Sequence, residues 1–140
     1  MAHPPEGPVA GVIAVVWRDG RVLLVRRRNA PNRGLWAFPG GRQRRGETIV
    51  AGALRELAEE TGLRAEAGEA FTAFDVFAPG GPDDAPHHFV LSAVLVRQAV
   101  GTAVAADDAQ EVGWFAADAL PEPAVPDLGR IARLSLEALA

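Results

Sequence analysis

The interval from Gly41 to Leu63 restricts the fold of this 140-residue chain more than any other, because it reads as a loop followed by one helix. Thr48 is a suitable N-cap residue, Gly62 suits the left-handed position after a helix end, and no proline interrupts the interval. At about 100° per residue, one side of this helix collects residues that predict a buried stripe. They are Val50, Leu54, Leu57 and Thr61.

Three glutamates share another face of the same helix, beside the stripe. Glu56, Glu59 and Glu60 are spaced i, i+3, i+4, so they lie on one side of the axis. Between Glu47 and Gly62 there are four glutamates and one arginine, whereas a stabilised surface helix would pair its acids with basic residues. Two unit charges about 5.5 Å apart repel by roughly 3 kcal/mol at an effective dielectric of about 20. A solvated acidic face is the alternative, but this imbalance favours a bound cation.

The donor atoms on this face indicate which cation would suit it. Mg²⁺ in proteins typically uses a few carboxylates together with water molecules and substrate phosphates. Softer metals fit poorly, because the chain has no cysteine and its histidines are His3, His87 and His88. The cluster therefore predicts a Mg²⁺ site.

Missing residue types remove several other chemistries. All 14 basic residues are arginine, so a Walker lysine, a Schiff base and a lysine general base are excluded. Without cysteine, the chain has neither a thiol nucleophile nor a disulfide framework. Its serines are Ser92, in an apolar run, and Ser135, in a C-terminal helical pattern, and they do not favour a serine triad. Water is the nucleophile that is left.

Strand and helix patterns alternate along the chain. Strands are expected at residues 9–17, 22–27, 35–38, 70–77, 89–96 and 111–115. Asp19-Gly20 is a hairpin signal between the first two strands, and Pro39-Gly40-Gly41 ends the third before the acidic helix. Residues 79–86 are rich in turn formers, helical turns are expected through Leu120, and a last helix is expected at 127–139. This order predicts an α/β fold, an α/β/α sandwich with a mixed sheet.

Length and charge narrow the class of protein. At 140 residues, the chain is long enough for one domain with its own core, expected at residues 9–140 after a flexible leader at 1–8. The formal charge of −4 disfavours a general nucleic-acid binder. No apolar run has membrane-spanning length, and residues 1–8 lack the features of a signal peptide. We therefore expect a cytoplasmic protein with neither membrane nor nucleic acid as its partner.

The acidic helix and the loop before it resemble the Nudix box, the signature of the Nudix hydrolase family. The matching positions are Gly41, Glu47, Arg55-Glu56-Leu57, Glu59-Glu60 and Gly62-Leu63. Phe38-Pro39-Gly40 and Gly46 are also similar to the family, and the resemblance extends from about residue 9 to residue 120. Arg44 departs from the pattern, because many members have an acidic residue there. The chain is most similar to small bacterial ADP-ribose pyrophosphatases, which implies a Nudix-type α/β/α sandwich.

The resemblance also implies a role for each matching residue. The implied ligands of Mg²⁺, or of Mn²⁺ in its place, are Glu56, Glu59, Glu60 and the backbone carbonyl of Gly40. Arg55 would orient one of these carboxylates. Glu47 would support the loop or reach the metal through water, and the alternative for Glu47 is an acid favoured near the helix N-terminus.

Family members commonly draw a further carboxylate from a loop before a late tryptophan. Here Asp107, Asp108 and Glu111 precede Trp114. We expect Asp108 or Glu111 to be the general base or an extra metal ligand. The alternative for all three acids is a solvated turn.

Two groups of arginines lie where they can attract substrate phosphates. Solvated arginines are the alternative for both groups. The groups are Arg26, Arg27 and Arg28 at a strand end and Arg42, Arg44 and Arg45 after Gly41. Arg26, Arg27 and Arg42 are the candidates for substrate binding.

Four aromatic residues can either stack on a nucleobase or belong to the core, where aromatic residues of strands more often lie. They are Trp36, Phe38, Phe74 and Phe77. Trp36 and Phe38 are the candidates for substrate binding.

The resemblance implies Mg²⁺-dependent hydrolysis of a diphosphate linkage in a small-molecule nucleotide. Pro79 lies sixteen positions past Leu63, where a proline is associated in this family with ADP-ribose hydrolysis, although Pro79 also opens a Pro-Gly-Gly-Pro turn. ADP-ribose or a related nucleotide sugar is the leading substrate. The alternatives are a house-cleaning nucleoside triphosphate pyrophosphohydrolase and a non-catalytic nucleotide sensor. The resemblance is also consistent with a homodimer.

Overall fold

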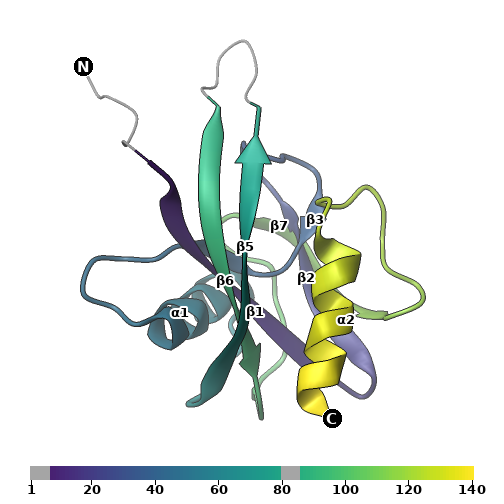
Figure 1. Ribbon diagram of the computed structural model, residues 1–140. Helices are drawn as coiled ribbons and strands as arrows, with labels where there is room; N and C mark the ends of the chain where they lie inside the picture. Colours follow the sequence, from purple (N-terminus) through teal and green to yellow (C-terminus); the bar gives the residue numbers. More distant parts are fainter. Residues whose placement is uncertain (1–6, 80–85) are drawn as a thin grey trace.

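A computed structural model describes residues 7–79 and 86–140 and joins seven strands of this part of the chain in one sheet (Figure 1). The main path of the sheet runs β3, β2, β1, β6, β5, while β4 pairs with β1 and β7 pairs with β2. In chain order the elements are β1 (Val9–Arg18), β2 (Arg21–Arg27), β3 (Trp36–Ala37), β4 (Gly40–Arg42), α1 (Ile49–Thr61), β5 (Gly68–Ala78), β6 (His87–Val96), β7 (Ala109–Ala116) and α2 (Leu128–Leu139).

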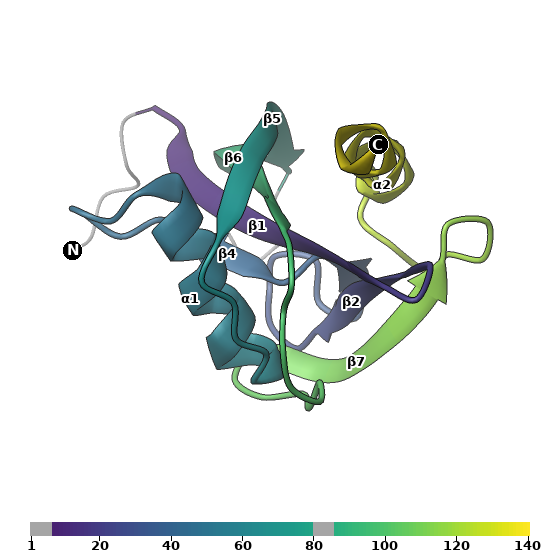
Figure 2. The ribbon, with the colours of Figure 1, turned by 90° about the horizontal axis from the view of Figure 1, so that it is seen from below.

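Strand β1 organises the sheet because its two faces contribute to two separate cores. Val12, Ala14 and Val16 belong to the core on the α1 side, whereas Ile13 and Val15 belong to the core on the α2 side. This alternation follows from the two-residue period of side chains along a strand. The two helices cover opposite faces of the sheet (Figure 2). The predicted α/β/α sandwich is therefore confirmed.

The sheet is mixed. β1 and β6 run parallel from the pair Val9 and Phe89 to the pair Val16 and Val96. The other pairings between named strands are antiparallel, including the β1–β2 hairpin whose turn contains Asp19-Gly20. β1 therefore lies between β2 and β6, and its first half also holds β4.

Helix α1 begins and ends as the sequence predicts. The Thr48 hydroxyl accepts a hydrogen bond from the Ala51 amide at 3.0 Å, and Gly62 follows the helix in the left-handed region with φ 75°. The Gly62 amide donates to the Ala58 carbonyl at 2.9 Å and closes the last turn. Both helix ends are therefore set by local hydrogen bonds.

The predicted buried stripe of α1 is partly wrong. Leu57 and Thr61 are fully buried, but Val50 and Leu54 are only half-buried. The most buried residues of the helix are Gly52, Ala53, Leu57, Glu60 and Thr61. The small Gly52 and Ala53 let the helix approach β1 closely, since a Cβ on Gly52 would lie 3.3 Å from Val12 Cγ2. Glu60 belongs to the same buried side of the helix.

The short strand β4 was not predicted from the sequence. We expected Pro39-Gly40-Gly41 to end a strand, but Gly40–Arg42 pairs with Ile13, Val12 and Gly11 of β1. A Cβ on Gly40 would lie 2.2 Å from the Val12 carbonyl oxygen, so glycine is required for this approach. Pairing with the long central strand therefore overrides the turn signal.

Other boundaries differ in smaller ways. The helical turns expected through Leu120 are wrong: β7 runs to Ala116 and ends in one turn, closed by the Ala119 amide on the Ala116 carbonyl at 3.0 Å. Pro121 and Pro123 follow and cannot continue a helix. The expected leader at 1–8 and the turn-rich segment at 79–86 lie mostly outside the described residues. None of the helices described in the structure is long and apolar enough to cross a membrane.

Candidate active site

Arg55 is the centre of a charged cluster on α1. Its Nε and Nη2 atoms donate to the two carboxylate oxygens of Glu47 at 2.9 and 2.7 Å. Its Nη1 donates to Glu56 Oε1 at 2.9 Å and to Glu59 Oε2 at 3.2 Å, and Nη2 also donates to the Arg42 carbonyl at 3.0 Å. These five bonds use all five donors of the guanidinium. One side chain therefore fixes three carboxylates and one backbone carbonyl.

Glu47 connects the loop before α1 to the helix. Besides its two bonds from Arg55, it accepts the Arg44 amide at 2.8 Å, and the Gln43 side chain donates to the Glu47 carbonyl at 2.9 Å. The bonds from Arg55, and then the Arg44 amide, lower the pKa of Glu47 to about 2. Glu47 is therefore ionised at neutral pH and organises the loop. It precedes the N-cap, so it does not lie in the first turn of the helix.

Glu60 and Glu56 lie against the backbone of β4. Glu60 is 2% exposed, and its Oε2 accepts the Gly40 amide at 2.9 Å. A Cβ on Gly41 would lie 2.5 Å from Glu56 Oε1, so the carboxylate in this position lies directly against the backbone of Gly41. Burial is the main cause that raises the pKa of both carboxyls, that of Glu60 to about 8. The solvated acidic face considered from the sequence is therefore excluded for these two residues.

Asp107 and Asp108 lie close to the glutamates of the helix. The Ala106 amide donates to the Glu60 carbonyl at 3.0 Å, and the Val104 amide donates to the Thr61 carbonyl at 2.9 Å. These bonds hold the loop before β7 against the C-terminal end of α1. The negative charge of Asp107 contributes to the raised pKa of Glu56, and that of Asp108 to the raised pKa of Glu60.

Glu111, the other candidate base, is placed differently. It lies on β7 and forms an exposed ion pair with Arg26 Nη1 at 3.2 Å. Unlike Asp107 and Asp108, it does not line the cavity next to the acidic cluster. Asp108 therefore lies near the glutamates of α1, whereas Glu111 lies outside the cavity wall.

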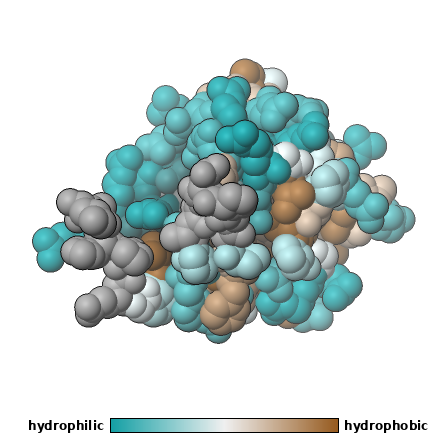
Figure 3. Space-filling view, turned by 90° about the horizontal axis from the view of Figure 1, so that it is seen from above, coloured by the Kyte–Doolittle hydropathy of each residue, from teal (hydrophilic) through white to brown (hydrophobic). Residues whose placement is uncertain are grey.

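A cavity of about 630 Å³ opens beside these carboxylates. One part of its wall is charged and comes from β2, β4 and the loop after it, α1 and the loop before β7: Arg27, Gly40, Gly41, Arg42, Arg44, Glu56, Glu59, Asp107 and Asp108. The other part is mostly apolar and comes from β5, β6 and the start of α2, including Phe74, Val76, Phe89, Leu91, Leu128 and Ile131. From above, hydrophobic surface is visible among hydrophilic side chains (Figure 3). The cavity therefore joins an acidic region to an apolar one.

Three of the predicted substrate-binding residues line this cavity: Arg27, Phe38 and Arg42. Arg44 and Phe74, which were weighed for the same role, line it as well. The wall of the cavity thus contains three of the arginines considered as phosphate contacts.

The other predicted substrate contacts lie elsewhere. Arg26 is bonded to Glu111 and, through Nε, to the Gly34 carbonyl at 3.1 Å. Trp36 is buried and packs edge-on against Phe115 at 5.1 Å between ring centroids. Pro79 is exposed and is not part of the wall. Trp36 therefore serves the core in this structure.

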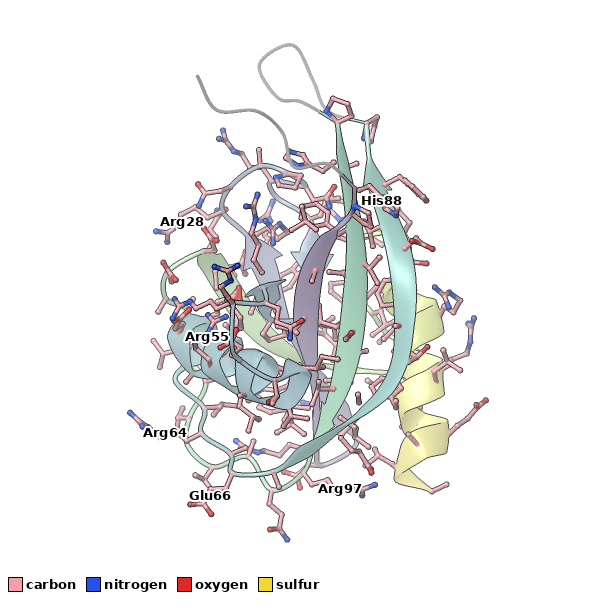
Figure 4. The ribbon with its side chains drawn as sticks, turned by 60° about the vertical axis from the view of Figure 1, so that its left-hand side comes forward. Arg28, Arg55, Arg64, Glu66, His88 and Arg97 are labelled. Carbon is pink, nitrogen blue, oxygen red and sulfur yellow. The ribbon has the colours of Figure 1, made fainter. Side chains whose placement is uncertain are left out.

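Phe77, Arg28 and Arg45 also lie outside the cavity. Phe77 is 71% exposed and stacks on His88 at 4.4 Å, on the opposite side of β5 from the cavity-lining Phe74 and Val76. Arg28 and Arg45 are exposed. In the side-chain view, Arg28 and Arg55 lie on the same side of the molecule (Figure 4).

Two parts of the cavity wall were not predicted from the sequence. Ala30, Pro31 and Asn32 contribute from the loop after β2, and residues 125–128 contribute from the start of α2. The sequence predicted a last helix at residues 127–139, but not what that helix would cover. The loop after β2 carried no comparable signal.

The donors of the acidic region suit a hard divalent cation, because all of them are oxygens. Within the described residues, no three acidic or histidine side chains are arranged to hold an ion as they stand. Arg55 draws Glu56 and Glu59 toward itself, while Glu60 bonds to Gly40. The charge of Glu56 is nevertheless close enough to contribute to the raised pKa of Glu60, a repulsion that a bound cation would offset.

Comparisons with known proteins agree with this geometry. The family model for the NUDIX domain matches residues 6–134. An ADP-ribose pyrophosphatase of Methanocaldococcus jannaschii is 33% identical over 116 residues, which are 82% of this chain and 66% of that protein. The chain thus spans just under two thirds of that relative and less than half of the next curated relatives that it matches.

Solved structures share the whole fold. A MutT NUDIX hydrolase from Burkholderia pseudomallei has a TM-score of 0.79 at 30% identity, covering 96% of this chain and 100% of that one. The NUDIX domain of Shewanella oneidensis NrtR, solved with ADP-ribose, has a TM-score of 0.76 at 26% identity, covering 96% of this chain and 90% of that one. With an intact box on α1 and a family match over nearly its whole length, the chain belongs to the Nudix family.

Proposed function

We propose that this chain is a Mg²⁺-dependent pyrophosphohydrolase that cleaves a diphosphate linkage in a nucleoside diphosphate joined to another group. One observation carries the proposal: the cavity has a carboxylate-rich region built on α1 and β4 and an apolar region beside it. The first suits a metal-bound diphosphate and the second suits a nucleoside. ADP-ribose or a related nucleotide sugar is the leading substrate.

Members of the Nudix hydrolase family depend on divalent metal ions. In this chain Glu56, Glu59, Glu60 and the carbonyl of Gly40 would hold the ion. When bound, a divalent ion neutralises phosphate charge and lowers the pKa of a coordinated water. Arg55 fixes the positions of the Glu56 and Glu59 carboxylates through Nη1, and Glu47 holds Arg55 in place through its two short bonds.

Asp108 is the general base that the geometry favours. It lines the cavity, and its charge acts on Glu60, whereas Glu111 is bonded to Arg26 outside the wall. Asp108 would accept the proton of the attacking water, and Arg27, which lines the same region, would stabilise charge on the phosphates.

The apolar part of the wall supports a nucleoside-containing substrate. Phe74 and Phe89 from the sheet, and Leu128 and Ile131 from α2, offer apolar surface to a base. ADP-ribose leads because it occurs in the names of two of the compared proteins, the archaeal pyrophosphatase and the NrtR complex. Pro79 adds no support, because it lies outside the wall.

A nucleoside triphosphate is the second candidate. Arg42 and Arg44 line the charged region in addition to Arg27, so a further phosphate would find positive charge there. A non-catalytic nucleotide sensor is the alternative of another class, and it differs from both enzymes by releasing no product.

The test is a panel of substrates with the purified chain and Mg²⁺, compared by kcat/KM. The panel contains ADP-ribose, other nucleotide sugars, dinucleoside polyphosphates, and ordinary and oxidised nucleoside triphosphates. We expect ADP-ribose to give AMP and ribose phosphate with the highest kcat/KM. Faster release of pyrophosphate from a triphosphate would favour the second candidate, and binding of ADP-ribose without hydrolysis would identify a sensor. The homodimer stays a prediction, which the solution mass of the same preparation tests.

A further inference from the structure

Asp108 is held by a segment far away in the sequence, residues 28 and 29 after the end of β2. The Arg28 amide donates to the Asp108 carbonyl at 2.8 Å. The Asn29 side-chain amide donates through Nδ2 to Asp108 Oδ1. The backbone and the side chain of Asp108 are thus both bonded to this segment.

The sheet itself does not constrain Asp108. The pairing of β2 with β7 shifts register between Arg26 and Arg27, which pair with Glu111 and Ala109 and leave Gln110 without a partner. Asp107 then adopts a left-handed backbone with φ 54°. Asp107 and Asp108 are the central residues of a turn that the Ala109 amide closes on the Ala106 carbonyl at 3.0 Å, which sets their backbone but not the side-chain torsions of Asp108. The orientation of the Asp108 carboxylate therefore depends on what its oxygens contact.

Asn29 provides that contact without being part of the cavity wall itself. The next residues, Ala30, Pro31 and Asn32, do line the cavity. The loop is held on its inner side by Arg27 Nε, which donates to the Pro31 carbonyl at 2.8 Å. Asn29 thus links the Asp108 carboxylate to residues 30–32 of the cavity wall, a loop that Arg27 holds in place.

We infer that Asn29 is a positioning residue that orients the Asp108 carboxylate toward the acidic region. The Asn29 amide bonds to Oδ1, so Oδ2 is the oxygen that would accept the proton of the water. A carboxylate held at one oxygen by a donor can rotate only a little, so this bond also fixes the direction of Oδ2. This inference rests on the proposed function, in which Asp108 is the general base. Asn29 is not part of the cavity wall, so its effect on the reaction is exerted through Asp108.

The test is a double-mutant cycle of Asn29→Ala and Asp108→Ala, measured on the best substrate of the panel. We expect Asn29→Ala to lower kcat about tenfold with KM changed less than about twofold, since one hydrogen bond to a charged group is lost. In the Asp108→Ala background, Asn29→Ala should have no further effect on kcat. Arg33→Ala, an exposed change in the same loop, is the control and should match the wild type.

Wild-type kcat in Asn29→Ala, or losses that multiply in the double variant, would overturn the inference. A second readout uses metal-free protein. Asn29→Asp is isosteric and places two carboxylates together, so the thermal midpoint should fall by a few degrees, about 2–5 °C. Asn29→Asp with Asp108→Asn should restore the midpoint while kcat stays as low as in Asp108→Asn alone. An unchanged midpoint in Asn29→Asp contradicts the contact.

The inference and the proposed function fail in different ways. A wild type that hydrolyses no member of the panel rejects the proposed function, and the inference falls with it. An active wild type together with a fully active Asn29→Ala rejects the inference alone.

Discussion

The two helices of the sandwich are attached to the same sheet by different means. Besides the buried apolar Ala53 and Leu57, α1 uses polar contacts to β4: Arg55 donates to the Arg42 carbonyl, and the buried Glu60 accepts the Gly40 amide. α2 uses apolar surface, with Leu128 and Ile131 at 3% and 0% exposure. Among the described polar contacts of α2, the buried one is Ser135, which accepts the Trp17 indole N–H at 2.8 Å.

The two helices therefore contribute differently to the same cavity: α1 provides carboxylates and α2 provides apolar surface. Charged groups hold a geometry only when each has a partner, so α1 is suited to fix reactive carboxylates. Apolar packing is less directional, so α2 is suited to form a wall that shapes the substrate region. Each of the following predictions changes one helix and asks whether reactivity or stability responds.

The largest expected effect is on the reactivity carried by α1. Glu59→Gln or Glu60→Gln should lower kcat at least about a hundredfold, because each removes a carboxylate that would ligate the metal. The glutamine oxygen can still accept the Gly40 amide, so circular dichroism should show a folded protein. Glu66→Gln, an exposed change after the helix, is the matched control. Near-normal turnover in both site variants would reject the metal assignment.

The next effect is on the packing of α2. Ile131→Ala should lower the free energy of unfolding by about 3 kcal/mol, since it opens a cavity at a fully buried position. It should raise KM more than it lowers kcat, because the residue lines the apolar region. Urea denaturation measures the first effect, and Leu136→Ala, at 39% exposure on the same helix, provides the comparison. Equal losses in the two variants would contradict the assigned helix face.

Arginine substitutions on the two helices compare their charges directly. Arg55→Ala should lower the free energy of unfolding by about 2 kcal/mol, because Glu47, Glu56 and Glu59 lose a partly buried partner. Arg130→Ala breaks an exposed pair with Asp127 and an Arg130 contact with the Phe74 ring, and should cost at most about 1 kcal/mol. Urea denaturation measures both losses. Equal losses in the free energy of unfolding would contradict the greater role of charged contacts in α1.

The last effect appears only in acid. The pKa of Glu47 is about 2 in the folded protein and 4.5 by its ordinary value, so the unfolded chain binds more protons between these pH values. The stability that ionised Glu47 provides is therefore fully present above about pH 4.5 and is lost as the pH falls toward 2. Denaturation of wild type and Glu47→Gln at pH 7, 5 and 3 should show a stability gap that narrows below pH 4.5. A gap that is constant over this range would contradict the low pKa.

Local features of α1 could be predicted because they depend on neighbouring residues. Thr48 caps the helix and Gly62 ends it through bonds that span three or four positions. The spacing of Glu56, Glu59 and Glu60 places them on one side of any helix. The sandwich also followed from the order of strand and helix patterns.

Other features needed contacts between distant residues. The helix turned further inward than its apolar residues indicated, because Gly52 and Ala53 fit closely against β1. β4 formed because β1 offered it a partner, although its own sequence signals a turn. The choice between Asp108 and Glu111 depended on Asn29 and Arg26, which are 79 and 85 positions away.

The sequence alone determined a capped helix with three carboxylates on one side, an oxygen-only donor set and the absence of competing nucleophiles, because these are properties of composition and of the helical period. Only the tertiary structure decided how deeply Glu60 is buried, which downstream acid joins it, and that α2 forms the apolar wall of the cavity. The burial of a side chain and the contacts between elements depend on residues far apart in the chain. A periodic pattern within one segment cannot specify which distant segments will pack against it.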